Sequence, residues 1–324
     1  MSSGILSSVV GKKDVVSRST REGYGDGLLN IGSKKNVVAL SADLAESTKV
    51  ALFANKYPAK FFQVGVAEQN MVTVASGLAH VGKIPFASSF AAFSPGRNLE
   101  QIRTTVCYND LPVKICSTHA GLGVGPDGAT HQALEDVAQM RSMPNMTVVC
   151  PADYNQAFQA VNAIYKWDKP VYLRLNRQKT KELIDTKIKF EIGKAQVLMS
   201  GSHVTIISFG PILSEVLDAA IKLNEEGIST EVLNLHTIKP LDVKAIIKSA
   251  KKTGFVVTVE DHVVQGGMGG AVSEVLCQNN PVPMRLLGVD NAFGESGEYE
   301  ELLEKHGLTS DHIFKEVETL LSKF

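Results

Sequence analysis

The sequence predicts an α/β protein with two open, mostly parallel sheets, each covered by helices on both faces. Short apolar runs alternate with longer helical segments along nearly the whole chain, as in proteins built on parallel sheets. The length of 324 residues is enough for two cores of ordinary size. Hydrophobic residues make up 44% of the chain and charged residues 21%, which is the balance of a globular protein.

The first domain is expected to span residues 1–180. Its strands are apolar runs, and helical segments separate them along the chain. The expected elements are a helix at 21–31, strands at 37–40 and 61–64, a helix from 68, a strand at 84–88, a helix at 99–108, strands at 113–117 and 147–150, a helix at 155–166 and a strand at 171–175. The helix from Glu68 carries small and apolar residues on most of its faces, so we expect it to be buried.

The boundary of the first domain is expected where the periodicity weakens and charge rises, between residues 179 and 194. We place a linker at 181–192 and a second, smaller domain at 193–324. Its expected strands lie near 204–209, 229–235, 255–260 and 283–287, and its expected helices near 212–226, 242–251, 270–278, 299–306 and 311–322. The same alternation again predicts an open α/β sheet.

Charge and composition argue against several classes of protein. The net charge of −1 gives no basic footprint for nucleic acid or an acidic membrane. No apolar run approaches the length of a membrane span, and the first residues show no basic targeting pattern. The four cysteines form no CxxC pair, and three of them adjoin or lie in apolar segments, so buried reduced thiols are the default expectation; they are Cys107, Cys116, Cys150 and Cys277. We expect a cytoplasmic protein with no nucleic acid or membrane partner.

A ligand crevice is expected outside the carboxyl ends of the first domain's strands, where open α/β sheets bind their ligands. Charged and polar side chains repeatedly follow the apolar strands there, which favours a site over a scatter of loop residues. The residues concerned are Ser41, Asp43, Glu68, Ser88, Ser89, His119 and either Arg174 or Arg177.

Glu68 stands between a strand, a glycine turn and the start of an apolar helix. The helix N-terminus favours its charged form, whereas desolvation favours its protonated form. A carboxylate held between these two effects can share a proton. The alternative is a first-turn glutamate that only complements the helix dipole.

The loop over residues 119–131 is the second informative stretch. Its four glycines allow positive φ angles and close approach of the backbone to a ligand. The imidazoles of His119 and His131 suit proton transfer near neutral pH and hydrogen bonds to sugar hydroxyls or phosphate oxygens, and the same loop carries the carboxylate of Asp127. The spacing His-x11-His is not a standard zinc pattern, so no metal ligand is assigned. Phe90 and Phe93, three residues apart, are equally compatible with core packing and with stacking on a flat ring.

Six ordered segments together resemble transketolase. They are SADLAES at 41–47, VGVAEQNM at 64–71, SSFAAF at 88–93, THAGLGVGPDGATHQ at 118–132, PAD at 151–153 and RLNRQ at 174–178. The resemblance covers nearly the whole chain, as a pyrimidine-binding domain followed by a transketolase C-terminal domain. No room precedes Asp43 for the domain that binds Mg²⁺ and the cofactor's diphosphate. The resemblance therefore implies the C-terminal subunit of a split transketolase, paired with a separate N-terminal subunit as two copies of each.

The family chemistry implies roles for five residues near the cofactor, thiamine diphosphate. Glu68 matches the glutamate that hydrogen-bonds the aminopyrimidine ring. Phe90 and Phe93 match aromatics around that ring, and Asp43 matches a residue near the cofactor and the interface. His131 matches the histidine that assists proton transfer at the sugar. Mg²⁺ is expected mainly on the partner chain.

The resemblance also implies a sugar phosphate substrate, as in the pentose phosphate pathway. The groups that hold the phosphate are matched here by Arg21, Ser47, His119 and Arg177. The residue that hydrogen-bonds to the substrate's C2 hydroxyl is matched by Asp127. Arginine suits phosphate binding because its guanidinium is planar and permanently charged.

The chain departs from the family pattern at two positions. Gly96 stands where the third aromatic of the pyrimidine pocket is expected, and Gln69 replaces a histidine.

Two glycine-rich stretches are interpreted as structural. Gly25-Asp26-Gly27 resembles the start of the diphosphate motif of thiamine enzymes, but it lies inside a predicted helix before the first strand. Residues 266–270 could form an anion nest at a helix start. A packing and turn device is the favoured interpretation there.

Three other functions remain open from the sequence. The β subunit of a 2-oxo acid dehydrogenase has a similar length and the same two domains, but the loop with His119 and Asp127 suits hydroxylated, phosphorylated sugars better. A fragment of a deoxyxylulose phosphate synthase is a second alternative. A non-catalytic subunit that keeps only the fold is the third.

Overall fold

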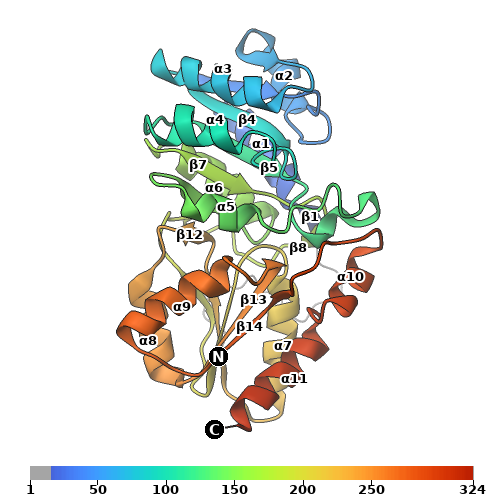
Figure 1. Ribbon diagram of the computed structural model, residues 1–324, viewed down its shortest axis with the longest axis vertical. Coiled ribbons are helices and arrows are strands. Elements are labelled where there is room, and N and C mark those ends of the chain that lie inside the picture. The colour runs from blue at the N-terminus through green and yellow to red at the C-terminus, as the bar shows by residue number, and fades with distance from the viewer. Residues whose placement is uncertain (1–15, 324) are drawn as a thin grey trace.

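The computed structural model describes residues 16–323 as two α/β domains, one above the other in Figure 1. A seven-stranded sheet forms the first domain and a five-stranded sheet the second. Both sheets are mainly parallel and carry helices on both faces, so the predicted fold class is confirmed. No helix in the described part of the chain is long and apolar enough to cross a membrane.

The first sheet has the strand order β12-β6-β7-β5-β4-β2-β3, and only β12 is antiparallel to its neighbour. Its strands are β2 Val37–Ser41, β3 Phe61–Gln63, β4 Ile84–Phe90, β5 Lys114–Thr118, β6 Thr147–Val149, β7 Val171–Arg174 and β12 Thr237–Lys239. Its helices are α1 Thr20–Ile31, α2 Ala51–Lys56, α3 Glu68–His80, α4 Leu99–Gln101, α5 Asp136–Ser142 and α6 Tyr154–Tyr165. A π-helical segment, Ile102–Cys107, directly follows α4.

The two faces of this sheet bury different helices because side chains alternate along each strand. Leu40, Ala87 and Ile115 pack toward α3, the π-helical segment and α5. On the other face, Phe86 and Leu173 pack toward α1, α2 and α6. This arrangement places the starts of α1 and α3 beside the carboxyl ends of the strands.

The second sheet has the order β14-β13-β10-β11-β9, with β9 antiparallel. Its strands are β9 Gln196–Met199, β10 Val204–Ser208, β11 Thr230–Asn234, β13 Val256–Val263 and β14 Met284–Val289. The helices are α7 Leu213–Glu225, α8 Val243–Thr253, α9 Met268–Asn279, α10 Tyr299–Lys305 and α11 Ser310–Leu321. Helices α8 and α9 share one apolar cluster with α3 and α5, so the core continues from one domain into the other.

The prediction that the helix from Glu68 is buried was wrong for one of its faces. Gln69, Thr73, Gly77 and His80 are exposed in α3, and a Cβ at Gly77 would meet nothing within 4 Å. These positions recur about every four residues and so form one side of the helix. Small residues had been interpreted as core, but here they line an open surface.

Several short elements were not predicted. The charged stretch after Arg177 begins as strand β8, Lys179–Lys181, which pairs antiparallel with β1, Ser17–Ser19. Helices α2 and α5 and strand β12 were also missed. Strand β12 comes from the second half of the chain and closes the first sheet, which ties the two domains together.

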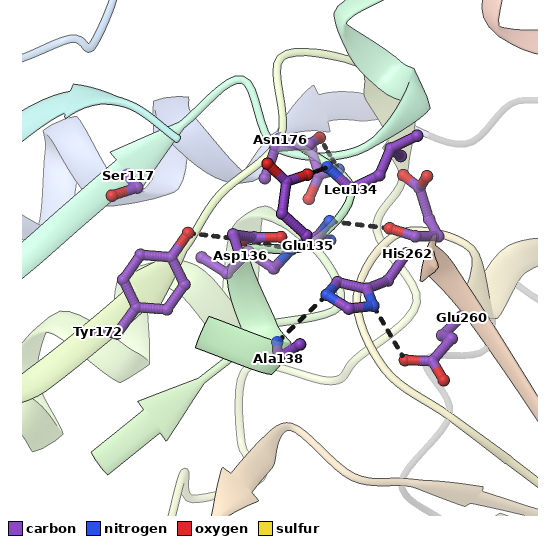
Figure 2. Close-up of polar contacts among 12 residues, drawn as sticks. Ser117, Leu134, Glu135, Asp136, Ala138, Tyr172, Asn176, Glu260 and His262 are labelled. Carbon is purple, nitrogen blue, oxygen red and sulfur yellow. Dashed lines mark hydrogen bonds and ion pairs between the residues drawn. The ribbon is translucent and has the colours of Figure 1, made fainter. Parts of the chain in front are cut away.

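A buried polar cluster holds the domains together at their junction (Figure 2). Arg174 Nε donates to Asp136 Oδ2 across 2.9 Å, and its Nη2 donates to the backbone oxygen of Asp261 across 2.8 Å. Tyr172 donates to the same Asp136 oxygen. His262 Nε2 accepts from the Ala138 amide across 3.3 Å. Burial lowers the pKa of His262 to about 4, so this imidazole is neutral near pH 7.

Candidate active site

The carboxyl ends of β4 and β5 bring three of the predicted residues into direct contact. Phe90 ends β4 and His119 follows β5, and their rings stack with centres 3.7 Å apart. Arg21, in the first turn of α1, donates from Nη1 to His119 Nε2 across 3.4 Å. The same Arg21 nitrogen donates to the backbone oxygen of Ser47 across 2.9 Å. One predicted cluster therefore draws on segments far apart in the sequence.

The aromatic pair connects this cluster to His131. Phe90 and Phe93 stack with ring centres 5.7 Å apart. The His131 ring meets Phe93 edge-on at 5.3 Å. His131 also exchanges a hydrogen bond with Thr130 through Nδ1 at 2.9 Å. The sequence left core packing and ring contact open for the two phenylalanines, and the structure places both beside the histidines.

His119 is a neutral group in this site. Its burial, followed by the charges of Arg21 and Arg177, lowers its pKa to about 3. Arg21 donates to Nε2, so Nδ1 carries the proton and donates to Thr118 Oγ1 across 2.8 Å. His119 can therefore orient Arg21 without adding a second positive charge near pH 7.

Arg21 has one nitrogen to spare. Burial and the nearby charge of Arg177 lower the pKa of Arg21. Among the residues that the structure describes, its Nε is buried and has no hydrogen-bond partner. A buried guanidinium donor without an acceptor is costly, and an anionic ligand would satisfy it. This orphan donor fits a bound phosphate group.

Arg177 and Asp127 form the exposed rim of the site. Arg177 Nη1 donates to Asp127 Oδ2 across 3.2 Å and to the backbone oxygen of Val124 across 3.0 Å. The two charged side chains are 39% and 42% exposed. Such an exposed pair contributes little to stability, so both groups are available to a ligand. Arg174, the other arginine considered for the crevice, is instead sealed in the domain junction.

The loop that carries His119, Asp127 and His131 is held from the second domain. The amide of Leu122 donates to Asp261 Oδ1 across 2.8 Å. Gly121 has φ +75, and a Cβ there would overlap the Asp261 carboxylate. This explains one glycine of the motif, because only glycine tolerates both the angle and the close approach.

Other contacts brace the same loop on both sides. Gln132 donates to the backbone oxygen of Glu295, and Asn176 donates to that of Ala120. Asp261 and Asn176 were missed as functional residues. Neither lies in the glycine-rich loop, and only the fold brings them to it.

Glu68 is the first residue of α3, as predicted, and is only 4% exposed. Its Oε1 accepts a hydrogen bond from Arg97 Nη1 across 3.0 Å. The guanidinium carbon of Arg97 also lies 4.0 Å from the centre of the Phe93 ring. Arg97 thus joins the acid to the aromatic pair, although the sequence did not single it out. In the sequence, the one feature that pointed to this contact was the position of a cationic side chain four residues after Phe93.

Two predicted residues are less firmly connected. Asp43 is exposed with φ +62, and its amide donates to Gln63 Oε1 across 2.7 Å. Within residues 16–323, no hydrogen bond or ion pair joins the Asp43 side chain to the cluster around His119. Ser47 reaches that cluster through its backbone oxygen. The roles of both residues stay predictions.

The two glycine-rich stretches outside the site are structural, as interpreted. Gly25 and Gly27 lie within α1 and pack against Lys49 and Val161. In the stretch over residues 266–270, Glu260 fills the position of an anion, because it accepts from the amides of Met268 and Gly269. Within residues 16–323, no group of three or more potential metal ligands occurs.

Known proteins identify the family to which this arrangement belongs. Residues 17–182 match the family described as transketolase, pyrimidine binding domain, and residues 193–313 match transketolase, C-terminal domain. The chain belongs to the transketolase family. It is similar to the "Putative transketolase C-terminal section" of Methanocaldococcus jannaschii, with 47% identity over 93% of this chain and 96% of that protein.

Two further relatives of the transketolase chain have nearly the same length. The first is a 6-deoxy-6-sulfo-D-fructose transketolase subunit from Clostridium sp. (strain MSTE9), 44% identical over 91% of this chain and 92% of that one. The second is a solved structure described as a split gene transketolase, inactive beta4 tetramer. It has a TM-score of 0.87 and 44% identity and covers 95% of this chain and 99% of that one. The expected resemblance to the C-terminal subunit of a split transketolase is confirmed.

Proposed function

We propose that this protein is the catalytic C-terminal subunit of a two-chain transketolase. It transfers a two-carbon ketol unit from a ketose phosphate to an aldose phosphate. The observation that carries the proposal is a buried carboxylate, Glu68, linked through Arg97 to Phe93 and from there to His131. Phe90 connects Phe93 to the cluster of Arg21 and His119 at the same sheet edge. The first half of that arrangement suits a cofactor ring and the second half suits an anionic sugar.

The residues present fit the pyrimidine half of thiamine diphosphate, the cofactor on which transketolases depend. Glu68 offers a buried acceptor for the ring nitrogen, and Phe90 and Phe93 offer aromatic faces at the same edge. When bound, the cofactor supplies an electron sink at its thiazolium carbon. Glu68 would share a proton with the ring nitrogen of the bound pyrimidine. Asp43 follows β2 and is exposed, and we assign it to the contact with the cofactor and the partner chain.

The substrate half of the site rests on cations and one hydrogen-bonded loop. Arg21 provides the buried Nε without a partner, and Arg177 adds an exposed guanidinium, so both can bind a phosphate group. His119 orients Arg21, and Ser47 supports it through its backbone oxygen. Their combined charge favours a substrate that carries an anionic end group.

Proton transfer and sugar recognition fall to the loop residues. His131 lies beside Phe93 and can move a proton at the sugar carbonyl and hydroxyl. Asp127, on the rim next to Arg177, can accept a hydrogen bond from the C2 hydroxyl of the substrate. In this proposal the loop carries both the acid–base group, His131, and the residue that recognises the sugar hydroxyl, Asp127.

A separate N-terminal subunit completes the proposed enzyme. This chain spans nearly the full length of relatives named as a C-terminal section or as a beta chain of a split transketolase. The partner would hold Mg²⁺ and the diphosphate, and two copies of each chain would assemble. Activity of this chain would then require the partner.

The direct test is reconstitution of ketol transfer. The chain alone and the chain mixed with the product of the adjacent open reading frame are assayed with xylulose 5-phosphate, ribose 5-phosphate, Mg²⁺ and thiamine diphosphate. The proposal predicts transfer only in the mixture. If neither sample transfers the unit, sulfonated sugars and 2-oxo acids are assayed next. Decarboxylation of a 2-oxo acid alone would replace the proposed function with that of a dehydrogenase subunit.

A further inference from the structure

Arg97 occupies the surface on which the cofactor's pyrimidine ring is proposed to bind. Its Nη1 donates to Glu68 Oε1 across 3.0 Å, and its guanidinium carbon lies 4.0 Å from the centre of the Phe93 ring. A single side chain thus takes both the buried carboxylate and the aromatic face. Nothing in the proposed reaction assigns a role to this residue.

The guanidinium and an aminopyrimidine have similar shapes and similar bonding groups. A guanidinium is flat, carries N–H donors along its edge and stacks on aromatic rings. An aminopyrimidine is also flat, and its protonated ring nitrogen carries an N–H donor at the ring edge. Both groups need the Glu68 oxygen and the exposed face of Phe93. The two cannot hold these contacts at the same time.

Arg97 can leave without disturbing its surroundings. Its side chain is 49% exposed, whereas that of Glu68 is 4% exposed, and ion pairs with a solvent-exposed member are weak. The backbone nearby is fixed independently of the guanidinium. Gln69 Nε2 donates to the Arg97 backbone oxygen across 3.1 Å, and Asn98 Nδ2 donates to the Glu68 backbone oxygen across 3.0 Å. Only the side chain of Arg97 has to move.

Gly96 explains why the covering group comes from position 97. A Cβ at Gly96 would overlap the carbonyl oxygen of Ala92, so no side chain fits there in this backbone conformation. The aromatic expected at this position is therefore excluded by geometry. The next residue along the chain, Arg97, supplies the group that covers Phe93.

We propose that Arg97 is a displaceable placeholder for the pyrimidine ring. It keeps the Glu68 carboxylate paired and the Phe93 face covered until the ring replaces it. This inference rests on the proposed function, since it assumes that thiamine diphosphate binds at Glu68. A protein whose binding-competent form is only partly populated shows a proportionally weaker apparent affinity. Removing the placeholder should therefore strengthen cofactor binding.

The test is the dissociation constant of thiamine diphosphate for the assembled two-chain complex. Titration calorimetry at saturating Mg²⁺ compares the wild type with Arg97→Ala and Arg97→Gln. Arg97→Ala is expected to bind about three- to tenfold more tightly, because it removes a weak ion pair and a cation–π contact. Arg97→Gln, which keeps a donor but not the charge, should lie between. Arg103→Ala is the matched control, an exposed arginine on the π-helical segment.

The outcomes separate this inference from the proposed function. Equal or weaker binding by both Arg97 variants, with normal binding by the wild type, would overturn the placeholder role alone. A wild-type complex that binds no cofactor contradicts the proposed function and removes this inference with it. Tighter binding by Arg97→Ala without ketol transfer in any sample supports the placeholder and contradicts the assigned substrates.

Discussion

Two glutamates at helix starts show how differently the two domains use the same local design. Glu68 begins α3 in the first domain, and Glu260 on β13 lies against the start of α9 in the second. Both are almost fully buried. Glu68 pairs with the half-exposed Arg97, whereas Glu260 accepts from the amides of Met268 and Gly269. The first carboxylate has a partner that can move, and the second is fixed by its own backbone.

Two arginines three residues apart repeat the contrast. Arg174 ends β7 and is sealed in the domain junction by Asp136 and the backbone of Asp261. Arg177 points to the loop rim and is half exposed. A polar side chain can bind a ligand only where its hydrogen bonds and ion pairs are not already made within the folded protein. By this criterion the polar groups at the strand ends of the first domain are available to a ligand, whereas those buried at the domain junction serve as a structural support.

The largest expected effect comes from Glu68→Ala. Ketol transfer by the assembled complex should fall by at least about 10³-fold, because the proton-sharing carboxylate is lost. Stability should change by less than about 1 kcal/mol, since the lost partner, Arg97, is half exposed. Steady-state kinetics and thermal unfolding measure both quantities. Normal turnover at saturating cofactor would remove Glu68 from the catalytic role.

Glu260→Ala is the matched control in the second domain. It leaves the two amides of α9 unpaired in a buried place, so the free energy of unfolding should fall by about 2–4 kcal/mol. Turnover per folded complex should stay the same. A loss of turnover equal to that of Glu68→Ala would show that the two carboxylates do not differ in the way described.

Substitution of Arg177 should affect substrate binding, whereas substitution of Arg174 should affect the stability of the fold. Arg177→Ala is expected to raise the Michaelis constant for phosphorylated sugars by about tenfold, because a charge-assisted contact is lost. Arg174→Ala is expected to cost about 3–5 kcal/mol of stability, because the buried Asp136 carboxylate would lose its cationic partner. Kinetics with phosphorylated and unphosphorylated ketoses and denaturant titrations measure these effects. An unchanged Michaelis constant for Arg177→Ala would place the phosphate elsewhere.

Asp261 belongs to the second domain but holds the loop over residues 119–131 of the first domain, so its substitution tests how one domain supports the other. Asp261→Ala removes the acceptor of the Leu122 amide, so the Michaelis constant should rise by about three- to tenfold as the loop loses its position. Asp261→Asn keeps an oxygen for this amide and should restore most of the affinity. Hydrogen exchange at Leu122 provides a readout independent of activity. Identical exchange in the wild type and Asp261→Ala would contradict the support role.

The last expected effect is a pH dependence of stability. Burial raises the pKa of Glu260 from 4.5 to about 7, so the folded protein keeps this proton longer than the unfolded chain. The contribution of Glu260 to stability is therefore complete below pH 4.5 and declines as the pH rises through 7. Relative to Glu260→Gln, the wild type should lose roughly 1–3 kcal/mol over this range. Denaturant titrations at several pH values measure the difference, and a constant difference would contradict the prediction.

Much of the fold could be predicted because buried parallel strands are continuous apolar runs. The strands now assigned as β2, β4, β10 and β13 were all anticipated from this signal. Strands β1 and β12 have three residues each, which is too short for an alternation of apolar and polar residues to be recognised in the sequence. The exposed side of α3 was missed because glycine and threonine are equally compatible with a core and with an open surface.

The site could be predicted only where its residues lie within contiguous motifs. His119, Asp127 and His131 share one loop, and Glu68 and Phe90 each lie a few residues after a predicted strand. Asp261 lies 139 residues from Leu122, and no local pattern signals that contact. The ion pair of Glu68 with Arg97 depends on a rotamer rather than on spacing.

The most direct test of the contrast between the two glutamates is proton exchange at the reactive thiazolium carbon of bound thiamine diphosphate. The exchange rate is measured in D₂O with the assembled complex of the wild type, Glu68→Ala and Glu260→Ala. The account predicts fast exchange in the wild type and in Glu260→Ala, and exchange near that of free cofactor in Glu68→Ala. Fast exchange in Glu68→Ala would contradict the claim that this carboxylate moves the proton.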